Sequence, residues 1–157
     1  MTDTPAIQLR EITESDLEIF FNHEQDSEAA HRMNFASRPR PVFMARFTKN
    51  LADPTTFNRT VVVDGEVAGN IACWEQEGER WIGYVYGRDF WGRGIGTAAM
   101  REFLELAHWR PLCADPAARN VGSWRLLEKC GFKRAKSITV PDVHVHGTVE
   151  HFIYRLD

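Results

Sequence analysis

The chain has 157 residues, of which 43% are hydrophobic and 26% charged, and its formal net charge at pH 7 is −3. This length predicts one domain spanning 1–157 with a core of its own, and the composition excludes a disordered chain. The negative charge argues against nucleic-acid binding through bulk positive charge, and no apolar run approaches the ~18 residues of a membrane span. Neither a nucleic acid nor a membrane is expected as a partner.

The N-terminus and the cysteines predict a cytoplasmic protein. Residues 1–5 contain neither the basic nor the apolar segment of a signal peptide. Cys73, Cys113 and Cys130 form an odd, widely spaced set without a CxxC motif. We therefore expect reduced thiols in the core.

The first third of the chain predicts a strand followed by two helices. Apolar and polar residues alternate over 7–12, which is typical of a half-buried strand. Thr13 and Asp16 resemble a capping box that starts a helix over about 14–33. Its apolar face is marked by residues at i, i+3 and i+4: Leu17, Phe20 and Phe21. Prolines then break the helix, and a second helix is expected over 42–51.

The middle of the chain predicts an antiparallel meander. Two β-branched runs, 60–63 and 67–74, flank Asp64-Gly65. This dipeptide favours a hairpin with a type I′ turn, because both central residues of that turn have positive φ. A second turn at 77–79 leads to a third strand over 81–86.

The last part of the chain predicts alternating helices and strands. A glycine-rich turn over 92–97 opens a helix expected to end near 109–110. The buried stripe of this helix is expected at four positions: Ile95, Ala99, Phe103 and Leu106. A short strand over 112–114 is expected to run parallel to 81–86, because a helix separates the two.

A helix over 120–130 follows, with Gly131 suited to its C′ position, and strands over 132–140 and 148–156 complete the chain. The order of these elements predicts a mixed α/β (α+β) fold. We expect a mixed central sheet of about seven strands with four helices.

The glycine-rich turn predicts an anion site. Glycines let the backbone approach a ligand closely, and the free N–H groups and dipole of the helix N-terminus favour a pyrophosphate. A Walker A loop is excluded because no Gly-Lys-Ser/Thr follows. A dinucleotide fingerprint, with Gly94, Gly96, Ala99 and the acidic Asp115, fits locally. However, only about sixty residues follow the turn, too few for several βαβ units.

Three segments in order along the chain carry a resemblance to a known superfamily. Residues 91–96 read Trp-Gly-Arg-Gly-Ile-Gly, where the loop of the superfamily reads Gln/Arg-x-x-Gly-x-Gly/Ala. Residues 120–132 contain Asn-x-x-Ser followed by Glu-Lys-Cys-Gly-Phe, and residues 84–86 match the strand before the loop. The chain resembles the GNAT superfamily of acyl-CoA N-acyltransferases. The sequence around Phe90-Trp91 is similar to its ribosomal-protein N-acetyltransferase branch.

The resemblance implies an N-acetyltransferase that moves an acetyl group from acetyl-CoA, its co-substrate, to a primary amine by direct attack in a ternary complex. The amine belongs to a small molecule or to a protein N-terminus, and the enzyme is a monomer or a homodimer. The alternative is a non-catalytic acyl-CoA sensor on the same fold. The implied cofactor-binding residues are Tyr84, Val85, Tyr86, Gly92, Arg93, Gly94, Ile95, Gly96, Thr97, Asn120 and Ser123.

Candidates for the general base lie in the first half of the chain. Glu24 continues the apolar stripe of the first helix at i+7. A desolvated carboxylate there would have a raised pKa and accept protons well near neutrality. The alternative is a helix end that emerges into solvent. Glu75 on the middle strand is a second candidate, and His23 titrates in the right range but lies one residue off the stripe.

The general acid is open at the level of sequence. Leu127 stands where many members of the superfamily carry a tyrosine that protonates the leaving thiolate. Ser123 is a candidate replacement, since it shares a helical face with Asn120; close packing explains a serine there equally well. Tyr84 or Tyr86 could also reach the thiol. The resemblance implies that a strand N–H near Tyr86 holds the oxyanion.

Two further groups of residues have alternative interpretations. His144 and His146 would share a face of an extended segment, and His151 or Asp142 could complete a metal site, but a polar loop explains them as well and no metal is expected. Three arginines near the predicted helix break belong either to a solvated rim or to a site for an acidic acceptor or the 3′-phosphate of CoA: Arg32, Arg38 and Arg40.

Overall fold

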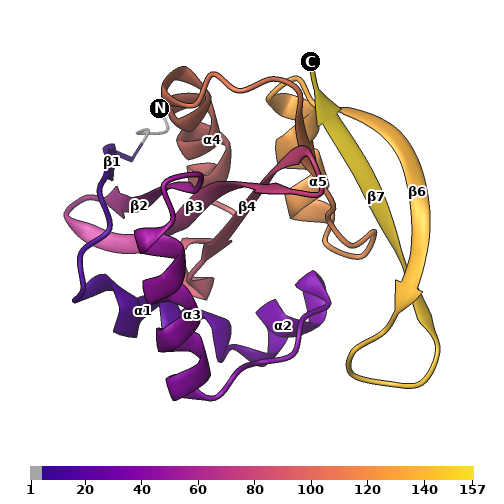
Figure 1. Ribbon diagram of the computed structural model, residues 1–157, viewed down its shortest axis with the longest axis horizontal. Coiled ribbons are helices and arrows are strands. Elements are labelled where there is room, and N and C mark those ends of the chain that lie inside the picture. The colour runs from indigo at the N-terminus through magenta and orange to yellow at the C-terminus, as the bar shows by residue number, and fades with distance from the viewer. Residues whose placement is uncertain (1–4) are drawn as a thin grey trace.

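Among residues 5–157, which the computed structural model describes, seven strands form one mixed sheet in the order β1-β2-β3-β4-β5-β7-β6 (Figure 1). The strands are β1 (Ile7–Arg10), β2 (Phe57–Val63), β3 (Glu66–Gln76), β4 (Glu79–Tyr86), β5 (Leu112–Ala114), β6 (Lys133–Pro141) and β7 (Thr148–Leu156). Only β4 and β5 pair in parallel, as the intervening helix predicted, and the other neighbours are antiparallel. The expectation that residues 1–5 form no signal peptide falls almost wholly outside the described residues and stays a prediction from the sequence.

The described residues also form five α-helices, one more than predicted, and one short 3₁₀ helix. They are α1 (Asp16–Glu24), α2 (Ser27–Met33), α3 (Arg40–Ala52), η1 (Arg88–Phe90), α4 (Ile95–Leu106) and α5 (Val121–Lys129). The prediction of a single helix over 14–33 is wrong: this segment forms two helices, α1 and α2. Asp26 adopts an extended conformation and its carboxylate accepts the N–H groups of Glu28 and Ala29, at 2.9 and 3.1 Å. This N-cap ends α1 and starts α2.

The predicted turns agree with the structure. Asp64 and Gly65 have φ of 49° and 83°, as a type I′ hairpin requires, and Gly131 follows α5 with φ of 93°. The predicted stripe of α4 holds for Ile95, Ala99 and Phe103, which are buried. It fails at Leu106, whose surface is 50% exposed, because α4 ends at this residue rather than near 109–110.

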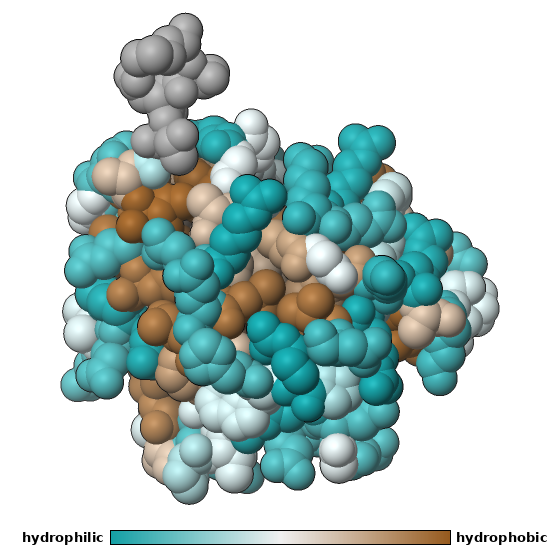
Figure 2. Space-filling model, turned by 90° about the horizontal axis from the view of Figure 1, so that it is seen from above, coloured by the Kyte–Doolittle hydropathy of each residue, from teal (hydrophilic) through white to brown (hydrophobic). Residues whose placement is uncertain are grey.

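Two apolar clusters hold the helices on the sheet. The larger one joins α4 and α5 to β2, β3 and β4, with Ile71, Phe103 and Leu127 at its centre. The smaller one lies between α1 and α3, around Phe20 and Phe43. From above, hydrophilic side chains surround the apolar patches of the surface (Figure 2). All three cysteines are free; Cys73 and Cys113 lie in the core as expected, whereas Cys130 is only partly buried. No helix among the described residues is long and apolar enough to cross a membrane.

A buried ion pair fastens the start of α1 to the sheet. Asp16 is 2% exposed, and its carboxylate accepts hydrogen bonds from Arg10, the Thr13 N–H and the Thr60 hydroxyl. Burial alone would raise the pKa of Asp16, but these donors outweigh it and lower the pKa from 3.8 to about 2. That difference corresponds to about 2 kcal/mol of stability. The Thr13–Asp16 contact is one half of the predicted capping box.

Asp16→Asn is expected to lower the free energy of unfolding by about 2 kcal/mol at pH 7. The contribution of the carboxylate is complete above its unfolded-state pKa of 3.8 and is lost as the pH falls through about 2. Urea unfolding at about pH 7 and about pH 2.5 measures this loss. The gap between the parent and the variant should narrow at the lower pH; an equal gap at both would assign the loss to packing instead.

Candidate active site

The parallel strands β4 and β5 part and open the sheet. They pair at only two positions, Arg80 with Leu112 and Trp81 with Cys113. Beyond these pairs β4 continues to Tyr86, whereas β5 ends at Ala114. The second half of β4 therefore has backbone groups on its β5 side that no strand of the described chain uses. Such an unpaired strand edge can bind an extended ligand through main-chain hydrogen bonds.

The main chain of Tyr86 points into this opening. The N–H of the next residue, Gly87, donates to the carbonyl oxygen of Ala68 on the β3 side, at 2.9 Å. Successive residues of a strand direct their N–H groups to opposite edges, so the N–H of Tyr86 faces away from β3. Its carbonyl oxygen also lies on that side, where it accepts the indole N–H of Trp91 at 3.0 Å. A free N–H at this position is suited to stabilising an oxyanion.

A cleft of about 350 Å³ runs along the open edge of β4 to the glycine-rich turn and α5. Its lining includes most of the predicted cofactor-binding residues: Tyr84, Val85, Tyr86, Gly92, Gly94, Ile95, Gly96, Thr97, Asn120 and Ser123. Arg93 is not part of the lining. Its guanidinium lies 5.6 Å from the ring centre of Phe90 and its side chain is exposed.

The glycines of the turn serve different purposes. Gly92 and Gly94 have φ of 72° and 76°, a left-handed conformation that favours glycine, and Gly94 is the N-cap of α4. The first N–H groups of α4 are thereby free for an anion. Gly96 packs closely against α5: a Cβ at this position would lie 2.5 Å from Cδ1 of Leu126, whose side chain would have to move.

Cationic side chains surround the same cleft. Arg32 of α2 lines it, with its guanidinium 4.7 Å from the ring centre of Trp91, and Arg125 and Lys129 line it from α5. Arg38 and Arg40, the other two arginines near the helix break, instead form ion pairs with glutamates of α1. The positive charge and the helix N-terminus make the cleft suitable for a phosphate-bearing ligand.

Tyr84 and Ser123, which the sequence could not rank as acids, are in contact. The Tyr84 hydroxyl lies 2.7 Å from Ser123 Oγ and also donates to the Ser123 carbonyl oxygen at 3.3 Å. Burial raises the pKa of Tyr84, so the phenol stays protonated over the physiological range and can act as a proton donor. The hydroxyl of Tyr86 is buried without a hydrogen-bond partner among the described residues, and burial raises its pKa too.

Asp115 lies at the inner end of the opening. A second hollow of about 120 Å³ adjoins the cleft, shares Tyr84 and Ser123 with it, and is lined by Asp115, directly after β5. The Asp115 side chain is exposed towards this hollow, but the surrounding protein desolvates it and raises its pKa, partly offset by His151. A carboxylate with a raised pKa beside a ligand cleft is a candidate general base. The sequence suggested Asp115 only for a dinucleotide fold.

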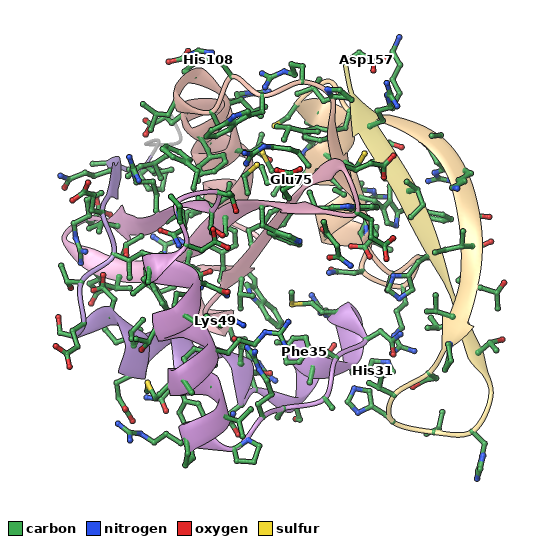
Figure 3. All side chains as sticks on the ribbon, in the orientation of Figure 1. His31, Phe35, Lys49, Glu75, His108 and Asp157 are labelled. Atoms are coloured by element: carbon green, nitrogen blue, oxygen red, sulfur yellow. The ribbon has the colours of Figure 1, made fainter. Side chains whose placement is uncertain are left out.

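The structure does not bring Glu24 or Glu75 into the cleft. Both oxygens of Glu24, the last residue of α1, accept hydrogen bonds from Arg38, at 2.9 and 3.0 Å. Burial raises the pKa of Glu24, opposed by Arg38 and Arg46. Glu75 is exposed near the end of β3, apart from His31 and Phe35 in Figure 3. Neither glutamate lines the cleft or the adjoining hollow.

Two histidines of the C-terminal half, His144 on the β6–β7 loop and His151 on β7, make hydrogen bonds to other segments. His144 contacts the Ala30 carbonyl oxygen, and His151 lies between Asp115 and Asn34. Among residues 5–157, no group of three or more His, Cys, Asp or Glu side chains is arranged to hold a metal ion. His23 packs on Gly87, outside the cleft, and burial lowers its pKa.

Comparison with known families agrees with this geometry. A family model described as acetyltransferase (GNAT) domain matches residues 7–133. The chain therefore belongs to the GNAT acetyltransferase family, and acetyl-CoA fits as its co-substrate. A kanamycin resistance protein of Rhizobium radiobacter is 36% identical over 55 residues, which cover 32% of this chain and 51% of that protein. The match thus spans about half the length of this relative.

Solved structures share the fold across nearly the whole chain. A GNAT acetyltransferase from Bacillus anthracis has a TM-score of 0.80 at 17% identity and covers 98% of this chain and 96% of its own. Spermidine N-acetyltransferase from Vibrio cholerae, in complex with CoA and spermine, has a TM-score of 0.84 at 12% identity, with coverage of 96% and 94%. The aminoglycoside acetyltransferase AAC(6')-Ib, with CoA, has a TM-score of 0.73 at 22% identity and 94% coverage of both chains.

Proposed function

We propose that residues 1–157 form a single N-acetyltransferase domain that transfers the acetyl group of acetyl-CoA to a primary amine of a small molecule. The observation that carries this proposal is the opening between β4 and β5. It joins a phosphate-binding turn at one end to Tyr84, Ser123 and Asp115 at the other. A cleft of this shape holds a long thioester with its reactive end between a proton donor and a proton acceptor.

The proposed reaction is direct attack in a ternary complex. The neutral amine attacks the thioester carbonyl carbon, a C–N bond forms, and the N–H of Tyr86 stabilises the oxyanion. Asp115 accepts the proton that the amine nitrogen loses. The C–S bond then breaks, and the Tyr84 hydroxyl protonates the departing thiolate. Tyr84 regains a proton from water through Ser123, and Asp115 releases to water the proton that it accepted. An alkyl thiol has a pKa of about 8.5, so this last step needs little help.

Small-molecule amines are the favoured acceptors. The names of three relatives support this choice: a kanamycin resistance protein, a spermidine N-acetyltransferase and an aminoglycoside acetyltransferase. The ribosomal-protein branch, suggested by the sequence around Trp91, would instead place a protein N-terminus in the cleft. A panel of polyamines, aminoglycosides, amino acids and peptides with free N-termini separates these acceptors when free CoA thiol is detected.

Acetyl-CoA is expected to raise the melting temperature of the protein, whereas NAD and ATP should not. Binding to the native state stabilises it by about 2.7 kcal/mol at a ligand concentration a hundred times Kd. Thermal denaturation with each ligand measures the effect. Stabilisation by NAD without stabilisation by acetyl-CoA would contradict the assignment of the cleft. Acetyl-CoA binding without turnover of any amine would favour the acyl-CoA sensor.

A further inference from the structure

The loop between β6 and β7, residues 142–147, is fastened to the end of α2. The N–H of Val143 donates to Asn34 Oδ1 at 3.0 Å, and the Nδ2 group of Asn34 donates to the Pro141 carbonyl oxygen at 3.2 Å. His144 Nε2 lies 3.1 Å from the Ala30 carbonyl oxygen. Figure 3 shows His31 of α2 beside this loop. Asn34 is the central residue of these contacts, and it caps α2 in a left-handed conformation with φ of 56°.

Asn34 also contacts His151, and the hydrogen bonds define the tautomer of this histidine. His151 Nδ1 lies 2.9 Å from the carbonyl oxygen of Asp115, which can only accept, so Nδ1 carries the proton. In the neutral ring, Nε2 is then an acceptor, and it lies 3.2 Å from Asn34 Nδ2, which donates. The orientation of the Asn34 amide is determined by Val143, whose N–H requires Oδ1 on its side.

Protonation of His151 is incompatible with this arrangement. The imidazolium has N–H groups on both nitrogens, so Nε2–H would face the Nδ2 group of Asn34, donor against donor. Rotation of the Asn34 amide would offer Oδ1 to His151 but withdraw it from Val143. His151 is 9% exposed, so water has little access to replace the lost bond. Charging one buried ring therefore loosens the loop from α2.

The charged and titratable groups near His151 and the loop are the Asp115 carboxylate, the Arg119–Asp142 ion pair and the ring of His144 beside Val143. The Asp115 carboxylate acts on the ring from the segment after β5. Arg119, before α5, reaches Asn34 Oδ1 at 3.5 Å and pairs with Asp142 of the loop at 2.9 Å. Arg119 and the His144 N–H lower the pKa of Asp142 to about 2, so that ion pair stays charged well below neutral pH. A change in the loop contact between about pH 5 and 8 then reports histidine ionisation.

We propose that Asn34 and neutral His151 form a latch that holds the 142–147 loop on α2 and fixes Asp115 beside the acceptor, which makes both of them positioning residues. The latch is connected to two residues that line the hollow beside the cleft, Asp115 and Met33. His151 binds the main chain of Asp115, and Asn34 follows Met33, which lines the same hollow. The positioning role rests on the proposed acetyltransferase function, whereas the latch itself can be tested without turnover.

The first test is NMR of the isotopically labelled full chain between about pH 5 and 8. The Val143 amide and the His151 ring are expected to titrate with one midpoint. In Asn34→Asp, a carboxylate accepts from Val143 and from the imidazolium together, so the midpoint should rise by about 1 unit or more. In His151→Gln the Val143 amide should lose the transition that it shares with the His151 ring, whereas any transition that arises from the adjacent His144 remains. His146→Gln, at an exposed position of the loop, is the control and should behave like the parent.

The latch is wrong if Val143 does not follow His151, or if neither Asn34→Asp nor His151→Gln changes its titration. The second test uses an amine that the panel identifies. KM for the amine should rise as the pH falls through the His151 midpoint. In Asn34→Asp this rise should disappear, because the carboxylate accepts from the imidazolium and from Val143 together, and Kd for acetyl-CoA should be unchanged. A moved NMR midpoint with an unchanged KM profile would overturn the positioning role. A working latch without turnover of any amine would contradict the proposed function instead.

Discussion

Asp115→Asn is expected to lower kcat for amine acetylation by about 10²–10⁴-fold near neutral pH, the usual contribution of a general base. The amide that replaces the carboxylate cannot accept the proton of the attacking amine, but the substitution keeps the side-chain size. It also keeps the main-chain carbonyl that His151 binds. Acetyl-CoA binding, measured separately by calorimetry, should therefore be unchanged. Loss of acetyl-CoA affinity in proportion to the loss of rate would show that Asp115 holds the co-substrate.

The role of Asp115 as a base predicts how the rate depends on pH. Desolvation by the surrounding protein raises the pKa of Asp115 from the ordinary value of an aspartate. A base works when ionised, so the parent rate should fall as the pH drops through that raised pKa. Asp115→Asn should not show this fall in rate at low pH. At high pH more of the amine is deprotonated in solution, and the deficit of the variant should shrink. A deficit that is equal at every pH would mean that Asp115 positions the substrate without accepting its proton.

Glu24→Gln and Glu75→Gln are the matched controls. Each makes the same carboxylate-to-amide change outside the lining of the cleft. Glu24→Gln also weakens the ion pair with Arg38, so this variant should be less stable. Its rate should still fall at low pH as in the parent. If Glu24→Gln abolishes the fall in rate at low pH and Asp115→Asn retains it, Glu24 is the base and reaches the amine through a water.

The sequence predicted those structural elements that neighbouring residues determine. Asp64-Gly65 encodes its own turn, and three glycines before an apolar stripe encode the start of α4. Most of the predicted cofactor-binding residues line one cleft, because the strand, turn and helix that carry the motifs meet there; that this cleft binds the cofactor stays a prediction. The break at Asp26 is also local, but its capping side chain lies within a pattern that continues the helix, and periodicity alone misses it.

The acceptor side of the site could not be predicted in the same way. Asn34 and His151 are 117 residues apart, and their contact depends on how the loop after β6 folds back onto α2. Asp115 lies beside the opening because β5 ends before β4 does, and this difference in strand length is a property of the sheet. Apolar periodicity led to Glu24, which is partly buried at the end of α1, but an arginine fourteen residues further on compensates its charge. The position of Glu24 relative to the cleft depends on the tertiary structure, which periodicity does not report.

Gly122→Leu is expected to weaken acetyl-CoA binding by about 5- to 150-fold while the protein stays folded, because its side chain would occupy space needed by the ligand and overpacking costs about 1–3 kcal/mol. Gly122 lies in the first turn of α5 and lines the cleft, with nothing within 4 Å of where a Cβ would stand. Leucine is a better helix former than glycine by about 0.8 kcal/mol, so the melting temperature without ligand should hold or rise.

Gly122→Ala separates the two effects of this substitution. Alanine gives at least the same gain in helix propensity but adds a single methyl group, so stability should rise as in Gly122→Leu with a much smaller change in Kd. Calorimetric titration with CoA and thermal denaturation of the free proteins measure both quantities. Because the two variants share the backbone effect, their difference in affinity reports only the volume of the side chain. Equal CoA affinities for Gly122→Ala and Gly122→Leu would place the bound ligand away from the N-terminus of α5.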